Sequence, residues 1–248
     1  MTAPAAAPQP VNLRVLLEEM IERGASDLHG RGGPLAVGIN QGGCFMRGLR
    51  DEQGRPVAAT PDIQFHVSTL SADMAGGQVH PYSGFTMSVC QLRPESRGQL
   101  RIRSRDAFEP PSIQPNYLAT DLDRRTNVAA VRAARAIADT PAMRPFVKRE
   151  VKPGPDAHSD AELLEFCRNH GATIFHPSGT CRMGSDALAV VDARLRVHGM
   201  AGLRVVDCSV MPTLVSGNTN APVVMMAEKA ADMVREDRHG ETGQLKVA

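Results

Sequence analysis

The chain has 248 residues, enough for one large domain or two small ones, and its 22 glycines and 18 prolines predict many turns and loops. Its 28 basic and 27 acidic residues give a formal charge of +1, which provides no electrostatic footprint for nucleic acid or an anionic membrane. Seven phenylalanines, two tyrosines and no tryptophan also argue against a stacking platform for single-stranded nucleic acid.

The cysteines and the first residues indicate a cytoplasmic protein. Five cysteines are an odd number, and they are widely spread without a Cys-x-x-Cys pair, which is typical of reduced thiols rather than a disulfide framework. Residues 1–11 lack the basic and apolar regions of a signal peptide, so we expect a flexible leader. No apolar run approaches the roughly 18 residues that span a bilayer. Peripheral attachment to the inner membrane is the alternative to a purely cytoplasmic location.

The first half of the chain predicts one helix and several short strands. Apolar residues at helical spacing predict a helix between Asn12 and Gly24, and a glycine-rich stretch follows at Gly30–Gly43. Short β-like runs come next, at Ile63–Val67, Phe85–Leu92 and Gln99–Arg105. Alternation of apolar and charged residues in the last run favours antiparallel strands with one covered face.

Two further helices are expected in the middle of the chain. They span about 121–139 and 160–169, and each opens on a capping pair, Thr120 with Asp123 and Ser159 with Glu162.

The last third of the chain has a different character. Gly202–Asp207 has the continuous apolar run of a strand buried on both faces. A polar loop follows at Ser216–Asn220, and a final helix is predicted to begin at Pro222, since proline is favoured in the first turn. The residues expected on its buried face are Val223, Met226, Ala227, Ala230, Met233 and Val234.

His176 is the first candidate catalytic residue. It follows an apolar lead and precedes Pro177 and several small residues, which places an imidazole where a strand ends in a sharp turn. Such a position is desolvated but reachable, so the ring is suited to accept a proton. A purely structural histidine is the alternative.

Two alternative types of site involve the residues around His176. Zinc could be bound by Cys167, His170, His176 and Cys181, but their spacing matches no common zinc pattern. A serine hydrolase is weaker still, because the chain has no Gly-x-Ser-x-Gly elbow.

The loop before the final helix is the second candidate site. Asn218 and Asn220 supply side-chain amides beside a helix N-terminus, whose free N–H groups and positive dipole end suit an electron-rich group. Helix capping by Asn220 alone is the alternative interpretation.

Five segments of the chain carry a family resemblance. Two lie upstream, at 30–43 and 98–118, and three follow: FHPSGTCRMG (175–184), VVDARLRVHGMAGLRVVDCSVMP (190–212) and GNTNAPVVMMAEKAADMV (217–234). The last three resemble the C-terminal signature of the glucose-methanol-choline (GMC) oxidoreductases, and of the choline dehydrogenase-like alcohol dehydrogenases in particular. The two upstream segments resemble that family's substrate-domain segments, so the resemblance covers about residues 30–235.

The resemblance implies oxidation of an alcohol, with FAD as the cofactor. His176 would take the proton of the substrate hydroxyl, and Asn218 would hydrogen-bond the substrate oxygen. The carbinol carbon would pass hydride to the flavin, giving an aldehyde from a primary alcohol. The positions that match the family's FAD-contacting segment are Asp207, Thr219, Asn220 and Pro222.

The resemblance also implies the organisation of the chain. No Gly-x-Gly-x-x-Gly occurs in it, so we expect the C-terminal half of such an enzyme without the glycine loop of the FAD site. The expected fold class is α+β: a mostly antiparallel sheet flanked by helices, plus a C-terminal strand and helix that complete an FAD-binding sheet. The expected parts are a leader (1–11), a substrate-binding domain (12–186), a segment of the FAD-binding domain (187–236) and a flexible tail (237–248).

The partner is expected to be a small alcohol, with Gln64 and His66 as weak candidates for the pocket wall, and the electron acceptor is undetermined. A silent chain, or a subunit that needs a separate FAD-binding polypeptide, is the rival to an active enzyme. Exposure of Leu203, Val205 and Val206 would favour a homo-oligomer or such a partner chain.

Overall fold

The computed structural model describes residues 40–73 and 77–244, which divide into two compact units. The first unit comprises residues 40–91 and 124–172, and the second comprises residues 92–123 and 173–244. The expected leader, the helix after Asn12 and most of the glycine-rich stretch lie outside the described residues. No described helix is both long and apolar enough to cross a membrane. The fold class is α+β, as expected.

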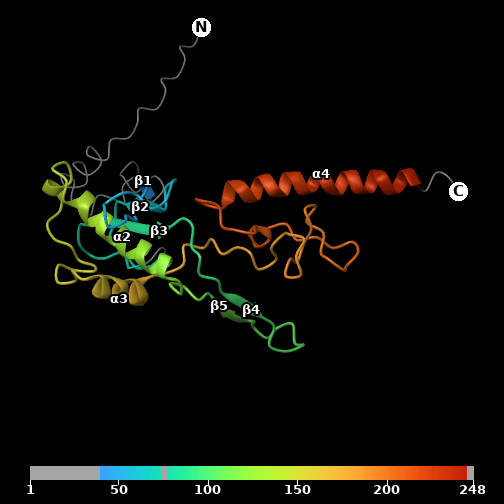
Figure 1. The fold of residues 1–248 in the computed structure, drawn as a ribbon, viewed down its shortest axis with the longest axis horizontal. Coiled ribbons are helices and arrows are strands. Elements are labelled where there is room, and N and C mark those ends of the chain that lie inside the picture. Colours follow the sequence, from blue (N-terminus) through green and yellow to red (C-terminus); the bar gives the residue numbers. More distant parts are fainter. Residues whose placement is uncertain (1–39, 74–76, 245–248) are drawn as a thin grey trace, which may run out of the picture. The chain divides into compact units, whose positions relative to one another are not determined.

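The first unit contains a sheet of three antiparallel strands in the order β1–β2–β3 (Figure 1). β1 spans Asn40–Met46, β2 spans Ile63–Ser68 and β3 spans Thr86–Gln91. The strands predicted at 63–67 and 85–92 are therefore confirmed, whereas β1 was missed because its first residues belong to the glycine-rich stretch. A Cβ atom on Gly43 would lie 3.2 Å from the carbonyl oxygen of Phe65, so the close approach of these strands favours glycine there.

One helix packs against a face of this sheet, and a second helix packs against the first. α2 spans Asp121–Ala138 and α3 spans Asp160–His170, close to their predicted bounds. Ile63 and Phe65 are fully buried with Ala130 of α2. Leu163 of α3 is buried against Val128 and Val131 of α2. Because side chains alternate along a strand, Gln64 lies on the opposite sheet face, where its Nε2 atom is 3.1 Å from Nε2 of His66.

The predicted capping pair of α3 is confirmed, whereas only one of the two expected capping hydrogen bonds forms at α2. Ser159 and Glu162 form a complete capping box at α3. At α2, Thr120 Oγ1 accepts from the Asp123 amide, but the Asp123 carboxylate accepts from the amides of Glu95 and Ser96 at 2.9 and 2.8 Å. A tertiary contact therefore replaces the expected local one.

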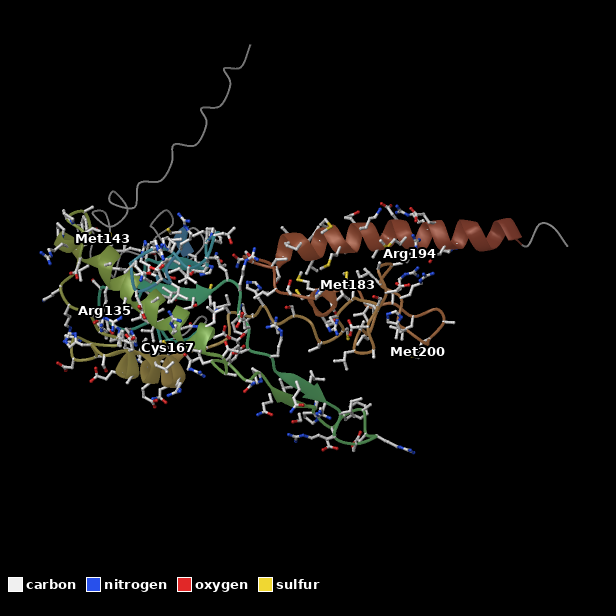
Figure 2. The ribbon with its side chains drawn as sticks, viewed as in Figure 1. Arg135, Met143, Cys167, Met183, Arg194 and Met200 are labelled. Atoms are coloured by element: carbon white, nitrogen blue, oxygen red, sulfur yellow. The ribbon has the colours of Figure 1, made fainter. Side chains whose placement is uncertain are left out.

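An arginine on α2 fastens the connection to α3. The guanidinium of Arg135 (Figure 2) pairs with both carboxylate oxygens of Glu150 at 2.9 and 3.0 Å, and it donates to the carbonyl oxygen of Ala157. Such a bidentate pair fixes direction as well as distance.

The second unit begins with a short ribbon instead of a longer strand. β4 (Gln99–Arg101) pairs with β5 (Ser112–Gln114), and both strands have only three residues. The predicted strand, which continued to Arg105, is too long. The expectation that one of its faces would be covered is also wrong, because Leu100 is 49% and Ile102 is 84% exposed. A two-stranded ribbon has no second layer of its own to bury one face.

The strand predicted at Gly202–Asp207 is also wrong. Only Arg204 forms a bridge, with Arg196, and Leu203 and Val206 are 45% and 36% exposed. Val205 is half-buried against the core of the unit. A strand buried on both faces needs neighbours on both edges, and the described part of this unit supplies a single bridge.

The last helix is longer than predicted. α4 spans Asn220–Gln244, so Pro222 is its third residue and still lies in the first turn, where no backbone N–H is required. Ala230 is buried in a core cluster with Val191, Leu195 and Val210, and Met226 packs against it. Of the face predicted to be buried, Ala227 and Val234 are exposed. The contact stripe is therefore narrower than the apolar pattern suggests.

Candidate active site

The segment that carries His176 is held by hydrogen bonds to the 208–211 region within the second unit. The amide of Cys181 donates to the carbonyl oxygen of Ser209 at 3.0 Å, and that of Met183 donates to Val210 at 2.9 Å. Gly179 has φ +87, and a Cβ atom there would lie 3.4 Å from the Met211 carbonyl oxygen. Two of the three C-terminal motifs thus form one framework.

The imidazole of His176 contacts the loop before α4 through both ring nitrogens. Nδ1 lies 2.8 Å from Oγ1 of Thr219, and Nε2 lies 3.0 Å from Nδ2 of Asn218. The structure therefore brings together the two predicted catalytic side chains, which are 42 positions apart in the chain. It also adds a third side chain, which the sequence motif assigned to the cofactor.

These contacts determine which ring nitrogen carries the proton. The amide nitrogen of Asn218 can only donate, so Nε2 of His176 must present its lone pair. Nδ1 then carries the hydrogen of the neutral ring and donates it to the Thr219 hydroxyl. In this arrangement the lone pair of Nε2 is directed at the Asn218 amide.

Thr219 has two functions at the N-terminus of α4. Its carbonyl oxygen accepts from the Val223 amide at 3.0 Å, which begins the helix, while its side-chain hydroxyl is directed at His176. The residue is 4% exposed, so this hydroxyl is a fixed partner. The helix start and the orientation of the imidazole are therefore set by one residue.

The other predicted cofactor residues lie around this helix and in the 208–211 region. Asn220 is the exposed first residue of α4, and Pro222 is half-buried in the same turn. The carboxylate of Asp207 accepts from the amide of Ser209 at 2.7 Å and from its hydroxyl, and so caps the short 3-10 helix Cys208–Val210. Among the described residues, no hydrogen bond joins Asp207 to His176.

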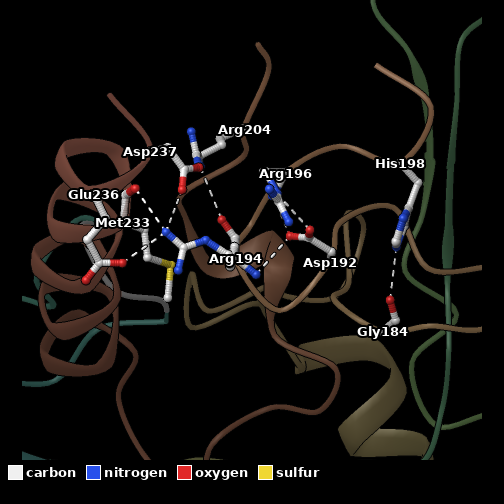
Figure 3. Close-up of polar contacts among 9 residues, drawn as sticks. All are labelled: Gly184, Asp192, Arg194, Arg196, His198, Arg204, Met233, Glu236 and Asp237. Atoms are coloured by element: carbon white, nitrogen blue, oxygen red, sulfur yellow. Dashed lines mark hydrogen bonds and ion pairs between the residues drawn. The ribbon is translucent and has the colours of Figure 1, made fainter. Parts of the chain in front are cut away.

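Farther along α4, a cluster of charges ties the helix to residues 192–204 (Figure 3). Nη2 of Arg194 donates to the carbonyl oxygen of Met233 at 3.1 Å, to Glu236 at 3.0 Å and to Asp237 at 2.7 Å. Arg204 pairs with the other oxygen of Asp237. Partial desolvation works to raise the pKa of Asp237, but the hydrogen bonds from the two arginines outweigh it and lower that pKa. No local signal in the sequence indicates this anchor, because its partners are about 40 positions apart.

The described residues contain no cluster of the kind that the zinc alternative requires. Within residues 40–73 and 77–244, no three His, Cys, Asp or Glu side chains gather in a way that could hold a metal ion. Cys167 and His170 lie on α3, in the first unit, and both ring nitrogens of His176 are engaged by protein groups.

Comparison with known proteins identifies the family. The profile described as GMC oxidoreductase matches residues 94–227, which is more than half of the chain. The chain belongs to the GMC oxidoreductase family, so the resemblance seen in the sequence motifs is confirmed.

Individual relatives share this similarity over a limited part of their length. An alcohol dehydrogenase [acceptor] of Pseudomonas putida is 40% identical over 204 residues, or 82% of this chain and 36% of the relative. An oxygen-dependent choline dehydrogenase of Escherichia coli is 41% identical over 229 residues, or 92% of this chain and 40% of the relative. Among solved structures, pyridoxine 4-oxidase from Mesorbium loti has 32% identity and a TM-score of 0.68, covering 78% of this chain and 37% of that one. The chain thus spans well under half the length of these relatives.

Proposed function

We propose that this chain supplies the base and the substrate-positioning amide of an FAD-dependent oxidation of a CH–OH group. The single observation that carries the proposal is the contact of His176 Nε2 with Asn218 Nδ2 at 3.0 Å, with Nδ1 held by Thr219. A hydroxyl oxygen can donate to a basic nitrogen and accept from an amide at the same time, so these two groups suit one alcohol.

FAD is the cofactor of the GMC family, and part of this chain is suited to it. The N-terminus of α4 carries a positive dipole end, and the exposed amides of Asn218 and Asn220 add donors beside it. Such donors suit the carbonyl oxygens at the edge of a flavin ring. We assign the flavin contacts to Thr219, Asn220 and Pro222, with Asp207 on the neighbouring segment. No glycine loop for the diphosphate occurs in the sequence.

The catalytic work of the chain's own residues is a proton transfer. In the ground state Asn218 occupies the lone pair of His176 Nε2. A substrate oxygen bridging both nitrogens at hydrogen-bond distance requires them to be about 4.5 Å apart, so the exposed Asn218 side chain has to move outward by about 1.5 Å. Nε2 then takes the hydroxyl proton, Asn218 donates to the oxygen, and Thr219 stabilises the resulting imidazolium as long as its hydroxyl accepts from Nδ1. Bound FAD supplies the acceptor for the hydride from the carbinol carbon.

The substrate is proposed to be a primary alcohol, oxidised to an aldehyde. The names of the two relatives, an alcohol dehydrogenase and a choline dehydrogenase, support this class. We further propose a cytoplasmic location, a substrate-binding domain over residues 12–186 and a segment of the FAD-binding domain over 187–236.

The test of His176 is a rapid-reaction measurement on an FAD-loaded form. His176→Ala should slow reduction of the flavin by alcohol by about two to four decades, the usual contribution of a general base. Asn218→Ala should retain FAD but weaken turnover. His198→Ala is a matched control, because His198 is an exposed histidine of the same unit that contacts the Gly184 carbonyl oxygen. An unchanged rate in His176→Ala would remove the base from the mechanism.

The second candidate is a chain that needs a separate FAD-binding polypeptide. The exposure of Leu203 and Val206 favours it, because a partner polypeptide would cover these apolar side chains. The visible spectrum of the purified chain separates the two candidates. Flavin bands near one FAD per chain support an enzyme, whereas a colourless protein that gains flavin only with a second polypeptide supports the subunit. Sedimentation should show self-association if a second copy covers the same surface.

A further inference from the structure

The ribbon of β4 and β5 exposes a row of apolar side chains. Leu100 lies opposite Ile113 in the register of the two strands, so both side chains share one face. They are 49% and 66% exposed, and Ile102, two positions after Leu100, is 84% exposed. Arg101 alternates with these residues and lies on the other face. One face of the ribbon is therefore apolar and uncovered within the part of the chain that the structure describes.

The turn at the end of the ribbon presents an aromatic ring. Phe108 is 94% exposed, the highest value among the large apolar residues that the structure describes. The Phe108 amide donates to the Asp106 carboxylate at 2.9 Å, and the Glu109 amide donates to the Asp106 carbonyl oxygen at 3.2 Å. The Asp106 amide donates to Oγ of Ser104 at 3.1 Å. The backbone of the turn thus has local hydrogen-bond partners, whereas the ring has almost no contact with the other described residues.

Arginines accompany these apolar side chains. Residues 97–105 contain no acidic residue and four arginines: Arg97, Arg101, Arg103 and Arg105. Arg101 donates to the side-chain oxygen of Gln99 at 2.8 Å, and Arg97 donates to backbone carbonyl oxygens. Within residues 40–73 and 77–244, the structure places no carboxylate in an ion pair with any of the four. The turn adds two acidic residues, so the ribbon with its turn keeps an excess of positive charge.

The net charge of the whole chain does not reveal this local excess. With 28 basic and 27 acidic residues, the chain averages to +1. Arginines beside exposed apolar side chains are nevertheless suited to anionic lipid, because binding at a membrane surface combines buried apolar area with attraction to the headgroups. The long stem of arginine lies along the apolar region while its guanidinium stays with the phosphates.

We propose that the β4–β5 ribbon and its turn bind the surface of an anionic membrane. Phe108 and the apolar face of the ribbon enter the boundary between headgroups and acyl chains, and the arginines bind the lipid phosphates. A second copy of the chain is a poorer match, since a stable protein interface takes about 20–30 residues on each side, whereas the ribbon with its turn comprises only residues 99–114. A peripheral contact of this kind is compatible with the proposed cytoplasmic location.

A single tryptophan at the turn tests the proposal, because the chain has none of its own. The emission of Phe108→Trp should shift to shorter wavelength when the full chain meets vesicles of phosphatidylcholine and phosphatidylglycerol in equal parts, and brominated lipid should quench it. Vesicles of phosphatidylcholine alone should bind the chain more weakly, and so should the mixed vesicles at about 1 M salt, where charges are screened beyond about 3 Å. Leu188→Trp is the matched control, because Leu188 is a 79% exposed residue elsewhere in the same unit, and its emission should stay unchanged.

The charge of the ribbon is tested by removing two arginines together. Each arginine near an anionic surface contributes about 5-fold to the affinity, so Arg101→Gln combined with Arg103→Gln should weaken vesicle binding by about 25-fold. Lys148→Gln combined with Arg149→Gln removes the same charge from two exposed residues of the first unit, and it should leave vesicle binding nearly unchanged. Circular dichroism checks that both double variants keep the fold, which is expected because all four side chains are exposed.

Three results overturn the proposal: no binding to the mixed vesicles, binding with an unshifted Phe108→Trp emission, or equal affinities of the two double variants. Emission of Phe108→Trp that is already shifted without vesicles, and that changes on dilution, would assign the ribbon to a second copy of the chain and overturn membrane binding as well. These measurements need neither flavin nor alcohol, so their outcome is independent of the proposed function.

Discussion

Replacement of Thr219 by valine tests the structure of the site most directly. The substitution keeps the shape of a side chain that is 4% exposed and removes only the hydroxyl that lies 2.8 Å from His176 Nδ1. A buried donor that loses its partner costs about 1–3 kcal/mol. Because the His176 ring is half-buried and water can reach it, the lower end applies, at about 1 kcal/mol, which corresponds to roughly a 5-fold change in an equilibrium.

The expected consequence is a change of tautomer. In the wild-type chain the Nδ1–H form should dominate, because Asn218 donates to Nε2 and Thr219 accepts from Nδ1. In Thr219→Val the Nε2–H form should gain about 5-fold, with Asn218 presenting its carbonyl oxygen instead. Imidazole ¹⁵N spectra measure the populations, and urea denaturation measures the stability. Thr219→Ser should behave like the wild type. Equal tautomer populations in the valine and serine variants would refute the argument.

Three further predictions concern the frame around the site. Hydrogen bonds from the backbone and hydroxyl of Ser159 lower the pKa of Glu162 to about 2, so the stabilisation of α3 by this carboxylate is complete above pH 4.5 and is lost as the pH falls toward 2. Glu162→Gln should therefore weaken the loss of helix signal at acid pH, measured by far-UV circular dichroism. An unchanged pH dependence would contradict the assignment. Leu163→Ala, at a fully buried position, should destabilise the first unit by about 2–4 kcal/mol in urea, against nearly nothing for Leu188→Ala at 79% exposure. Asp237→Asn should speed hydrogen exchange at the end of α4, because Arg194 and Arg204 lose their shared carboxylate; equal exchange rates would show that the ion pairs do not hold the helix.

The elements that the sequence predicted well carry their signals within a few residues. The capping box of α3 is complete within four residues, and its helix forms at the expected place. The strand at 202–207 failed for the opposite reason, since its apolar run depends on neighbours that its composition cannot reveal. α4 begins at Asn220, two residues before the start predicted at Pro222, because proline is tolerated throughout the first turn of a helix.

The candidate site shows the same division. The motifs point to His176 and Asn218 as residue types, and the structure places them in contact. The contact of Thr219 with the ring was not expected, because the motif assigns that position to the cofactor. Phe175 has φ +62, in the left-handed region, and the sequence did not predict this because phenylalanine is among the residues least suited to that region.

The sequence by itself determined the family, the kind of chemistry and the residues available for it, because family motifs and helix caps consist of residues that are close together in the chain. Only the tertiary structure decided which nitrogen of His176 is basic and how the ring is held. Both depend on hydrogen bonds between segments more than 40 positions apart, which form only when α4 and the 175–184 segment pack on a common core.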